Sequence, residues 1–174
     1  LLKEKLEELG LLNNKFKKAI DLGCGTGLAG AQFKAFVNYF VGIDLSSKML
    51  VEARKKKIYD KLFVNEILDG LEEINTNFEL FIATDVFVYI GDLSSLFECI
   101  YRYSENGAFF IFSTEHCEKG NFVLNPTGRY AHSENYITSI SRSFGFQLIN
   151  FSRIKLRKEH NNWIIGALYI LKKI

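Results

Sequence analysis

The clearest chemical pattern of the chain lies between Ala19 and Gly30, which read Ala-Ile-Asp-Leu-Gly-Cys-Gly-Thr-Gly-Leu-Ala-Gly. An apolar segment with one acid, Asp21, leads into a loop in which Gly23, Gly25 and Gly27 alternate with other residues. Glycine suits a backbone that takes positive φ or lies against a ligand. We expect a helix to begin near Leu28, and the free N–H groups of a helix N-terminus favour an anionic group. The pattern therefore predicts a loop that holds a nucleotide-like ligand with its backbone.

Two cofactor classes use such a loop, and Asp21 helps to distinguish them. The stretch from Gly25 to Gly30 also fits the dinucleotide fingerprint G-x-G-x-x-G. An acid at the mouth of that turn would repel a pyrophosphate, whereas S-adenosylmethionine carries an ammonium and a sulfonium cation together with one carboxylate. The residues favour S-adenosylmethionine over a nicotinamide dinucleotide, and a tight turn without any ligand is the structural alternative.

A second acid, Asp44, ends the next apolar segment, Val41 to Ile43. It lies about 20 residues beyond the glycines, the spacing at which an acid meets ribose hydroxyls in nucleotide-binding folds. Leu45 and Met49 follow closely and are placed to flank an adenine ring, although methionine is also a common filler of helix cores. Ser46 or Ser47 can cap the helix that we expect next.

These motifs resemble those of the class I S-adenosylmethionine-dependent methyltransferases. The resemblance rests on Asp21-x-Gly23-x-Gly25-x-Gly27 and on Gly42-Ile43-Asp44-Leu45-Ser46-x-x-Met49-Leu50. Two further stretches, Ala83 to Leu93 and Gly128 to Ser133, resemble the methyltransferase domain of bacterial predicted methyltransferases associated with tetratricopeptide repeats.

The resemblance implies a role for each residue of the cofactor site. Asp21 would serve the methionine amino end and Asp44 the ribose diol, while the glycine loop, Cys24 included, would take the methionine moiety and its carboxylate. An acid at the end of the third strand would accept the adenine amine, which makes Glu66, beside Ile67, the candidate and Asn65 the alternative. Backbone carbonyls at Asp85 and Val86 would meet the ammonium group.

The elements that must position these residues alternate between strands and helices, a pattern typical of βαβ units. We expect strands at Ala19–Leu22, Val41–Asp44, Leu62–Asn65, Leu80–Thr84 and Ala108–Ser113, and helices at Leu1–Leu12, Leu28–Val37, Ser47–Ile58, Leu93–Tyr103 and Ser133–Phe144. Two longer strands, Gln147–Arg157 and Trp163–Lys172, are joined by a polar turn at Glu159–Asn162 and should pair antiparallel. The expected fold is α/β: a Rossmann-like, doubly wound, mostly parallel seven-stranded sheet with an antiparallel C-terminal strand pair. Glu115 to Arg129 is predicted to be a long irregular loop.

The length of 174 residues fits one domain. By the resemblance, this is an S-adenosylmethionine-binding methyltransferase domain over residues 1–174, with an N-terminal helical segment, 1–17, that we expect to be cut short at its start. Apolar residues make up 48% and charged residues 24%, and the net charge of +2 gives no broad case for nucleic acid. The three cysteines show no metal-like spacing, which favours a reducing cytoplasm and no bound metal.

The methyl acceptor is less well defined by the residues. Arg129 suits a carboxylate or phosphate, His132 titrates near neutrality, and Tyr89 is placed to line an acceptor pocket, so these three are the catalytic candidates. No proline follows Asp85, as it would in enzymes that methylate nucleic-acid amines. We expect a small-molecule acceptor and no membrane partner. Methylation of a protein or nucleic acid, and a binding domain without catalysis, are the alternatives.

Overall fold

The computed structural model describes residues 2–13, 15–159 and 162–174. Its helices and 3-10 turns are α1 (Leu2–Glu8), α2 (Leu28–Phe33), η1 (Lys34–Phe36), α3 (Ser47–Lys55), α4 (Ile67–Ile74), η2 (Phe87–Tyr89), α5 (Ser94–Arg102) and α6 (Glu134–Ser143). Its strands are β1 (Phe16–Leu22), β2 (Val37–Asp44), β3 (Lys61–Val64), β4 (Phe78–Ala83), β5 (Ser104–His116), β6 (Phe122–Leu124), β7 (Tyr130–His132), β8 (Phe146–Glu159) and β9 (Asn162–Lys173).

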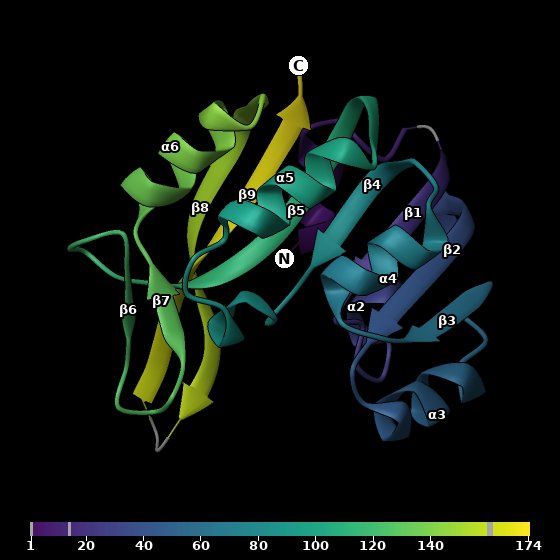
Figure 1. The fold of residues 1–174 in the computed structure, drawn as a ribbon, viewed down its shortest axis with the longest axis horizontal. Coiled ribbons are helices and arrows are strands. Elements are labelled where there is room, and N and C mark those ends of the chain that lie inside the picture. The colour runs from purple at the N-terminus through teal and green to yellow at the C-terminus, as the bar shows by residue number, and fades with distance from the viewer. Residues whose placement is uncertain (1, 14, 160–161) are drawn as a thin grey trace.

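Strand β1 lies inside the sheet because its second half is buried on both faces. It pairs in parallel with β2 on one side and with β4 on the other, and the parallel order continues outward to β3 and to β5. Beyond β5, the strands β9 and β8 pair antiparallel (Figure 1). The predicted fold class, a mostly parallel Rossmann-like sheet that ends in an antiparallel pair, is confirmed.

Helices cover both faces of this sheet. On one face, Leu71 of α4, Phe97 of α5 and Ile137 of α6 join a core that also holds Phe110 and Phe112 of β5. Figure 1 shows these three helices in front of the sheet. On the other face, residues of α1 and α2 pack onto β1, β2 and β4. This layering leaves the carboxyl edge of the parallel strands for the loops that bind ligands in open α/β sheets.

The region from Glu115 to Arg129, expected to be an irregular loop, is partly regular, so that prediction is wrong. Strand β5 continues to His116, and β6 then pairs antiparallel with β7 around a turn in which the Gly128 N–H donates to the Asn125 carbonyl. Strand β7 also pairs in parallel with the last residues of β5, past the point where β4 ends. The sheet is therefore nine-stranded rather than seven-stranded.

Two further differences concern helix boundaries. The helix expected at Leu28–Val37 ends at Phe33 and gives way to η1, because Val37 is drawn into β2 opposite Phe16. Helix α4, which we did not assign from the sequence, covers the front of the sheet. The expected polar turn at Glu159–Asn162 falls partly outside the described residues, as does Leu1 of the expected first helix.

No helix within the described residues has both the length and the apolar character needed to cross a bilayer.

Candidate cofactor site

The glycine loop connects β1 to α2 and takes a backbone path that favours glycine. Gly23, Gly25 and Gly27 have φ values of 66°, 52° and 80°. A Cβ atom at Gly23 would lie 2.3 Å from Cγ2 of Val86, whereas a Cβ at Gly25 would point into open space. The loop is thus pressed against the β4 segment at one glycine and leaves room for a ligand at another.

Asp44, at the end of β2, is bound to this loop. Its Oδ2 accepts a hydrogen bond of 2.8 Å from the Gly25 N–H, and its Oδ1 accepts one of 2.8 Å from the Ser46 N–H. Ser46 also caps α3, since its hydroxyl accepts from the Met49 N–H. The carboxylate therefore has a fixed orientation at the junction of two loops.

Asp21 lies beneath the loop rather than within reach of the solvent. Its side chain is 1% exposed, and its Oδ2 accepts a hydrogen bond of 2.6 Å from the Tyr59 hydroxyl. Burial raises the pKa of Asp21 to about 7, although the hydrogen bonds from Tyr59 and from the Gly30 backbone oppose this shift. Burial also raises the pKa of the neighbouring Cys24 thiol, so this cysteine stays protonated and acts as a small apolar residue.

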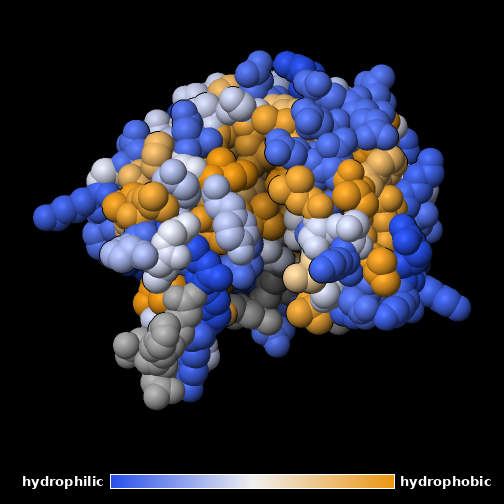
Figure 2. Space-filling model, turned by 60° about the horizontal axis from the view of Figure 1, so that its bottom comes forward, coloured by the Kyte–Doolittle hydropathy of each residue, from blue (hydrophilic) through white to orange (hydrophobic). Residues whose placement is uncertain are grey.

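A cavity of about 860 Å³ opens beside the loop, at the carboxyl edge of the sheet. Figure 2 looks onto this side of the molecule and shows hydrophobic residues gathered around a hollow. The volume falls within the range typical of small-molecule and cofactor sites. The cavity is lined by Gly23, Cys24, Gly25, Thr26, Leu28, Ala29, Asp44, Leu45, Ser46, Met49, Asn65, Glu66, Ile67, Leu68, Thr84, Asp85, Val86, Tyr89, Ile90, Asp92, Ser95 and Leu96.

The apolar walls of the cavity include two residues that the sequence places near an adenine ring. Leu45 is 69% exposed and Met49 is 46% exposed, so Met49 does not serve as a filler of the helix core. Glu66 precedes α4, and its backbone N–H donates to Oδ1 of Asn65, whose amide in turn donates to Glu73. The Asn65 side chain is thus engaged locally, which leaves Glu66 as the better candidate for an adenine amine.

The other end of the cavity is formed by the segment that follows β4. Asp85 has a φ of 57°, a left-handed conformation that is uncommon outside glycine. Its N–H donates to the Ser113 hydroxyl at 3.0 Å. Tyr89 is 68% exposed and lines the cavity. Asp92 and Ser95 lie here as well; no motif of the sequence marks them, because the start of α5 has no distinctive spacing.

The cavity lining does not include four of the predicted site residues: Asp21, Gly27, Arg129 and His132. Gly27 is the N-cap residue of α2, at the end of the loop. His132 is fully buried, and its Nε2 lies 2.9 Å from the Gly91 carbonyl oxygen. Burial lowers the pKa of His132, so the ring is neutral near pH 7 and Nε2 donates to that carbonyl. The structure thus gives His132 a supporting position behind the Gly91 segment instead of a place in the cavity.

Comparison with known proteins identifies the class that this fold and loop define. The family described as "Methyltransferase domain" matches residues 20–112. A malonyl-[acyl-carrier protein] O-methyltransferase of Erwinia billingiae is 30% identical over 98 residues, which are 56% of this chain and 39% of that protein. The chain spans less than half the length of the curated relatives that it matches.

Solved structures show the same fold over nearly the whole chain. An S-adenosylmethionine-dependent methyltransferase from Clostridium acetobutylicum matches with a TM-score of 0.75 and 18% identity, covering 99% of this chain and 90% of that one. The N-methyltransferase NodS from Bradyrhizobium japonicum, solved with S-adenosyl-l-homocysteine, matches with a TM-score of 0.75 and 15% identity, covering 98% and 85%.

The fold and the glycine loop define a nucleotide-binding α/β domain of the methyltransferase type. The chain belongs to the family described as "Methyltransferase domain", whose match covers more than half of the chain.

Proposed function

We propose that the chain transfers the methyl group of S-adenosylmethionine to a small molecule. One observation carries this proposal: the cavity is large enough for a cofactor and a small acceptor, and the described residues that line it include no lysine, arginine or histidine. Its charged residues are Asp44, Glu66, Asp85 and Asp92. Such a site disfavours the polyanionic backbone of a nucleic acid, which is normally bound by basic side chains. Because Arg129 and His132 lie outside the lining, the acceptor need not carry an acidic group.

The cofactor supplies an activated methyl group, and the residues of the chain supply position and a water-poor site. The loop Gly23 to Gly25 would hold the methionine moiety, Asp44 the ribose diol, Glu66 the adenine amine and Asp85 the ammonium end. Leu45 and Met49 would cover the adenine ring on the apolar wall. Asp21 would act through the loop that it supports, and Tyr89 would contact the acceptor.

The narrower resemblance to methyltransferases associated with tetratricopeptide repeats belongs to this proposal as well, and its support is the two stretches Ala83 to Leu93 and Gly128 to Ser133. We also propose a cytoplasmic location, because the three cysteines are free. Residues 1–174 would act as a single domain.

Two measurements test the function. Calorimetry should show binding of S-adenosylhomocysteine and much weaker or no binding of NAD. Incubation with S-adenosylmethionine labelled in its methyl group, together with a cell extract, should then place the label in the fraction of small metabolites. Label in RNA or protein would support the macromolecular alternative instead, and binding without any transfer would indicate a non-catalytic domain.

A further inference from the structure

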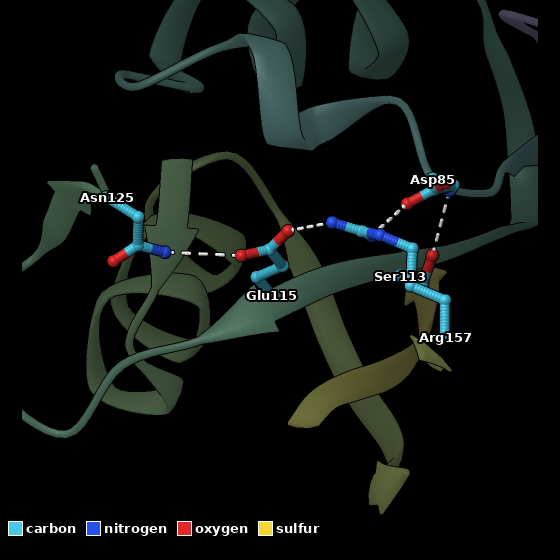
Figure 3. A network of polar contacts seen from close by, with 5 residues as sticks. All are labelled: Asp85, Ser113, Glu115, Asn125 and Arg157. Atoms are coloured by element: carbon cyan, nitrogen blue, oxygen red, sulfur yellow. Dashed lines mark hydrogen bonds and ion pairs between the residues drawn. The ribbon is translucent and has the colours of Figure 1, made fainter. Parts of the chain in front are cut away.

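A polar network lies beside the end of the cavity that the segment after β4 forms, and it joins four elements of the fold (Figure 3). Arg157 of β8 is at its centre: Nη1 donates to Oδ1 of Asp85 at 2.8 Å, and Nη2 donates to Oε1 of Glu115 on β5. Asn125, in the turn between β6 and β7, donates to the other oxygen of Glu115 at 3.2 Å. Of these residues, Asp85 alone lines the cavity.

A β-bulge directs Arg157 toward this network. In the pairing of β8 with β9, Lys155 is opposite Ile165 and Arg157 is opposite Ile164, so Leu156 is an extra residue. Because side chains alternate along a strand, Arg157 without the bulge would lie on the same face as Lys155. The extra residue moves Arg157 to the opposite face, the one that carries Glu115 across β9. Bulges that redirect a side chain are common next to active sites.

A glycine on the intervening strand makes the bulge possible. Gly166 of β9 is paired with Ile154 on one side and Glu115 on the other. A Cβ atom at Gly166 would lie 2.1 Å from the Leu156 side chain and 2.5 Å from the Thr114 carbonyl oxygen. The extra residue of the bulge therefore occupies the space that a side chain at this position would need.

Asp85 needs such support because of its own backbone. A non-glycine residue in the left-handed region persists only where its surroundings hold it there. The Asp85 N–H donates to the Ser113 hydroxyl, and the Arg157 guanidinium donates to one oxygen of the Asp85 carboxylate. Among the described residues, no hydrogen bond or ion pair takes the second oxygen, Oδ2.

The charges of the network explain why an arginine stands at its centre. Glu115 is 4% exposed, and a buried carboxylate is costly unless it is paired. The planar guanidinium donates to Glu115 and to Asp85 through separate nitrogen atoms, which a lysine ammonium cannot reproduce with the same geometry. Arg157 therefore links the buried acid of β5 to the acid at the cavity wall.

We propose that Arg157 is a positioning residue for the methionine end of the cofactor: it holds the Asp85 segment so that Oδ2 and the adjoining backbone are presented to the ammonium group. This rests on the proposed cofactor role of Asp85 and adds to it a residue of the C-terminal hairpin that lies outside the cavity. Binding of the adenosine half of the ligand should not depend on Arg157.

The experiment compares two nucleosides that differ at the methionine end. S-Adenosylhomocysteine carries the amino and carboxylate groups, whereas 5′-methylthioadenosine lacks both. By calorimetry on the whole chain, Arg157→Gln should bind S-adenosylhomocysteine about tenfold more weakly than the wild type, the scale of one charge-assisted hydrogen bond. Its affinity for 5′-methylthioadenosine should stay within about twofold. Arg157→Lys should recover only part of the loss.

Arg153→Gln is the matched control. Arg153 lies on the same strand and pairs with the exposed Glu118 at 2.6 Å, outside the network. Both nucleosides should bind this variant like the wild type. Equal losses of both ligands in Arg157→Gln would overturn the proposal, because they would indicate general destabilisation. Unchanged binding of both ligands would overturn it as well.

A double-mutant cycle tests whether Arg157 acts through Asp85. Asp85→Asn should weaken S-adenosylhomocysteine selectively, and adding Arg157→Gln to it should cause little further loss. Additive losses would contradict the proposal. If Arg157→Gln does not fold, Asp85→Asn alone still tests the proposal. If this variant distinguishes the two nucleosides as the wild type does, Asp85 does not bind the methionine end, and Arg157 cannot act through it. Binding of 5′-methylthioadenosine to the wild type tests the cofactor site separately.

Discussion

The Tyr59 hydroxyl, from the segment before β3, donates a hydrogen bond of 2.6 Å to the buried carboxylate of Asp21 beneath the glycine loop. The Tyr59 ring also fills the space next to two glycines: a Cβ at Gly27 would lie 3.1 Å from it, and one at Gly30 2.2 Å from its hydroxyl. Tyr59 therefore supports the glycine loop by hydrogen bonding and by packing, although it is 38 residues away from Asp21 in the chain.

Replacement of Tyr59 with phenylalanine should destabilise the protein while keeping the packing of the ring. We expect a loss of about 1.5–3 kcal/mol at pH 8, where Asp21 is ionised, and a smaller loss at pH 5, where it is protonated, because hydrogen bonds to charged groups are the stronger ones. Urea denaturation at the two pH values measures this. Tyr39→Phe, in β2, is the control. An equal loss of stability in Tyr59→Phe at both pH values would contradict the role assigned to the Asp21 charge.

The raised pKa of Asp21 predicts how stability depends on pH. The carboxyl has an ordinary pKa of 3.8 and a pKa of about 7 in the folded protein. Between these values the folded state keeps a proton that the unfolded state has released, so stability should fall as pH rises from about 4 to about 7. The slope from this group is at most about 1.4 kcal/mol per pH unit. Asp21→Asn should flatten it, and a slope that is unchanged in this variant would refute the assignment.

His132 should act in the opposite direction. Burial lowers its pKa from 6.5, so the unfolded chain takes up a proton more readily than the folded protein as pH falls below about 6.5. Stability from this group is therefore lost toward acid. His132→Leu should reduce that loss and lower the stability at pH 7.5 by about 1–3 kcal/mol, since the Gly91 carbonyl loses its donor. The affinity for S-adenosylhomocysteine should change less than about twofold, and a large change would place His132 in the site after all.

Asp44 allows a sharper test of the ribose assignment. Asp44→Ala should weaken S-adenosylhomocysteine by about 1–3 kcal/mol, the cost of unpaired hydrogen-bond partners in a closed site. Part of that loss would come from the Gly25 N–H, which also loses its acceptor. Asp44→Asn keeps an oxygen for one backbone donor and should bind with intermediate affinity. The affinity for 2′-deoxyadenosine derivatives should differ less between the wild type and Asp44→Ala than the affinity for the ribose ligands does. Equal losses of affinity for ribose and deoxyribose ligands would argue against contact with the diol.

The sequence was sufficient for the parts of the site that depend on local pattern. Positive φ at Gly23 and Gly25, and the end of a buried strand at Asp44, are properties of a few neighbouring residues, so their types and spacing predict them. The same reasoning predicts the antiparallel pair β8–β9, because two long strand-like segments joined by a short polar turn pair antiparallel.

The remaining features depend on contacts that no local pattern reports. Phe122 to Leu124 form a strand because Tyr130 to His132 fold back against them beside β5. His132 is a catalytic candidate from the sequence because imidazole titrates near neutrality, but the β6–β7 hairpin buries it behind Gly91. Arg157 looks like one of several surface cations of a basic strand, and only the one-residue bulge at Leu156 turns it toward Asp85.

The contact between Arg157 and Asp85 joins residues that are 72 positions apart, and the strand pair that carries Arg157 is attached to the sheet through β5. Contacts of such sequence separation form late in folding and depend on the docking of a whole hairpin. We therefore expect the two halves of the ligand site to belong to different cooperative units. Partial opening of β8–β9 would release the methionine end while the glycine loop and Asp44 stay closed around the adenosine. Amide exchange should show this as earlier loss of protection at Asp85 than at Gly25.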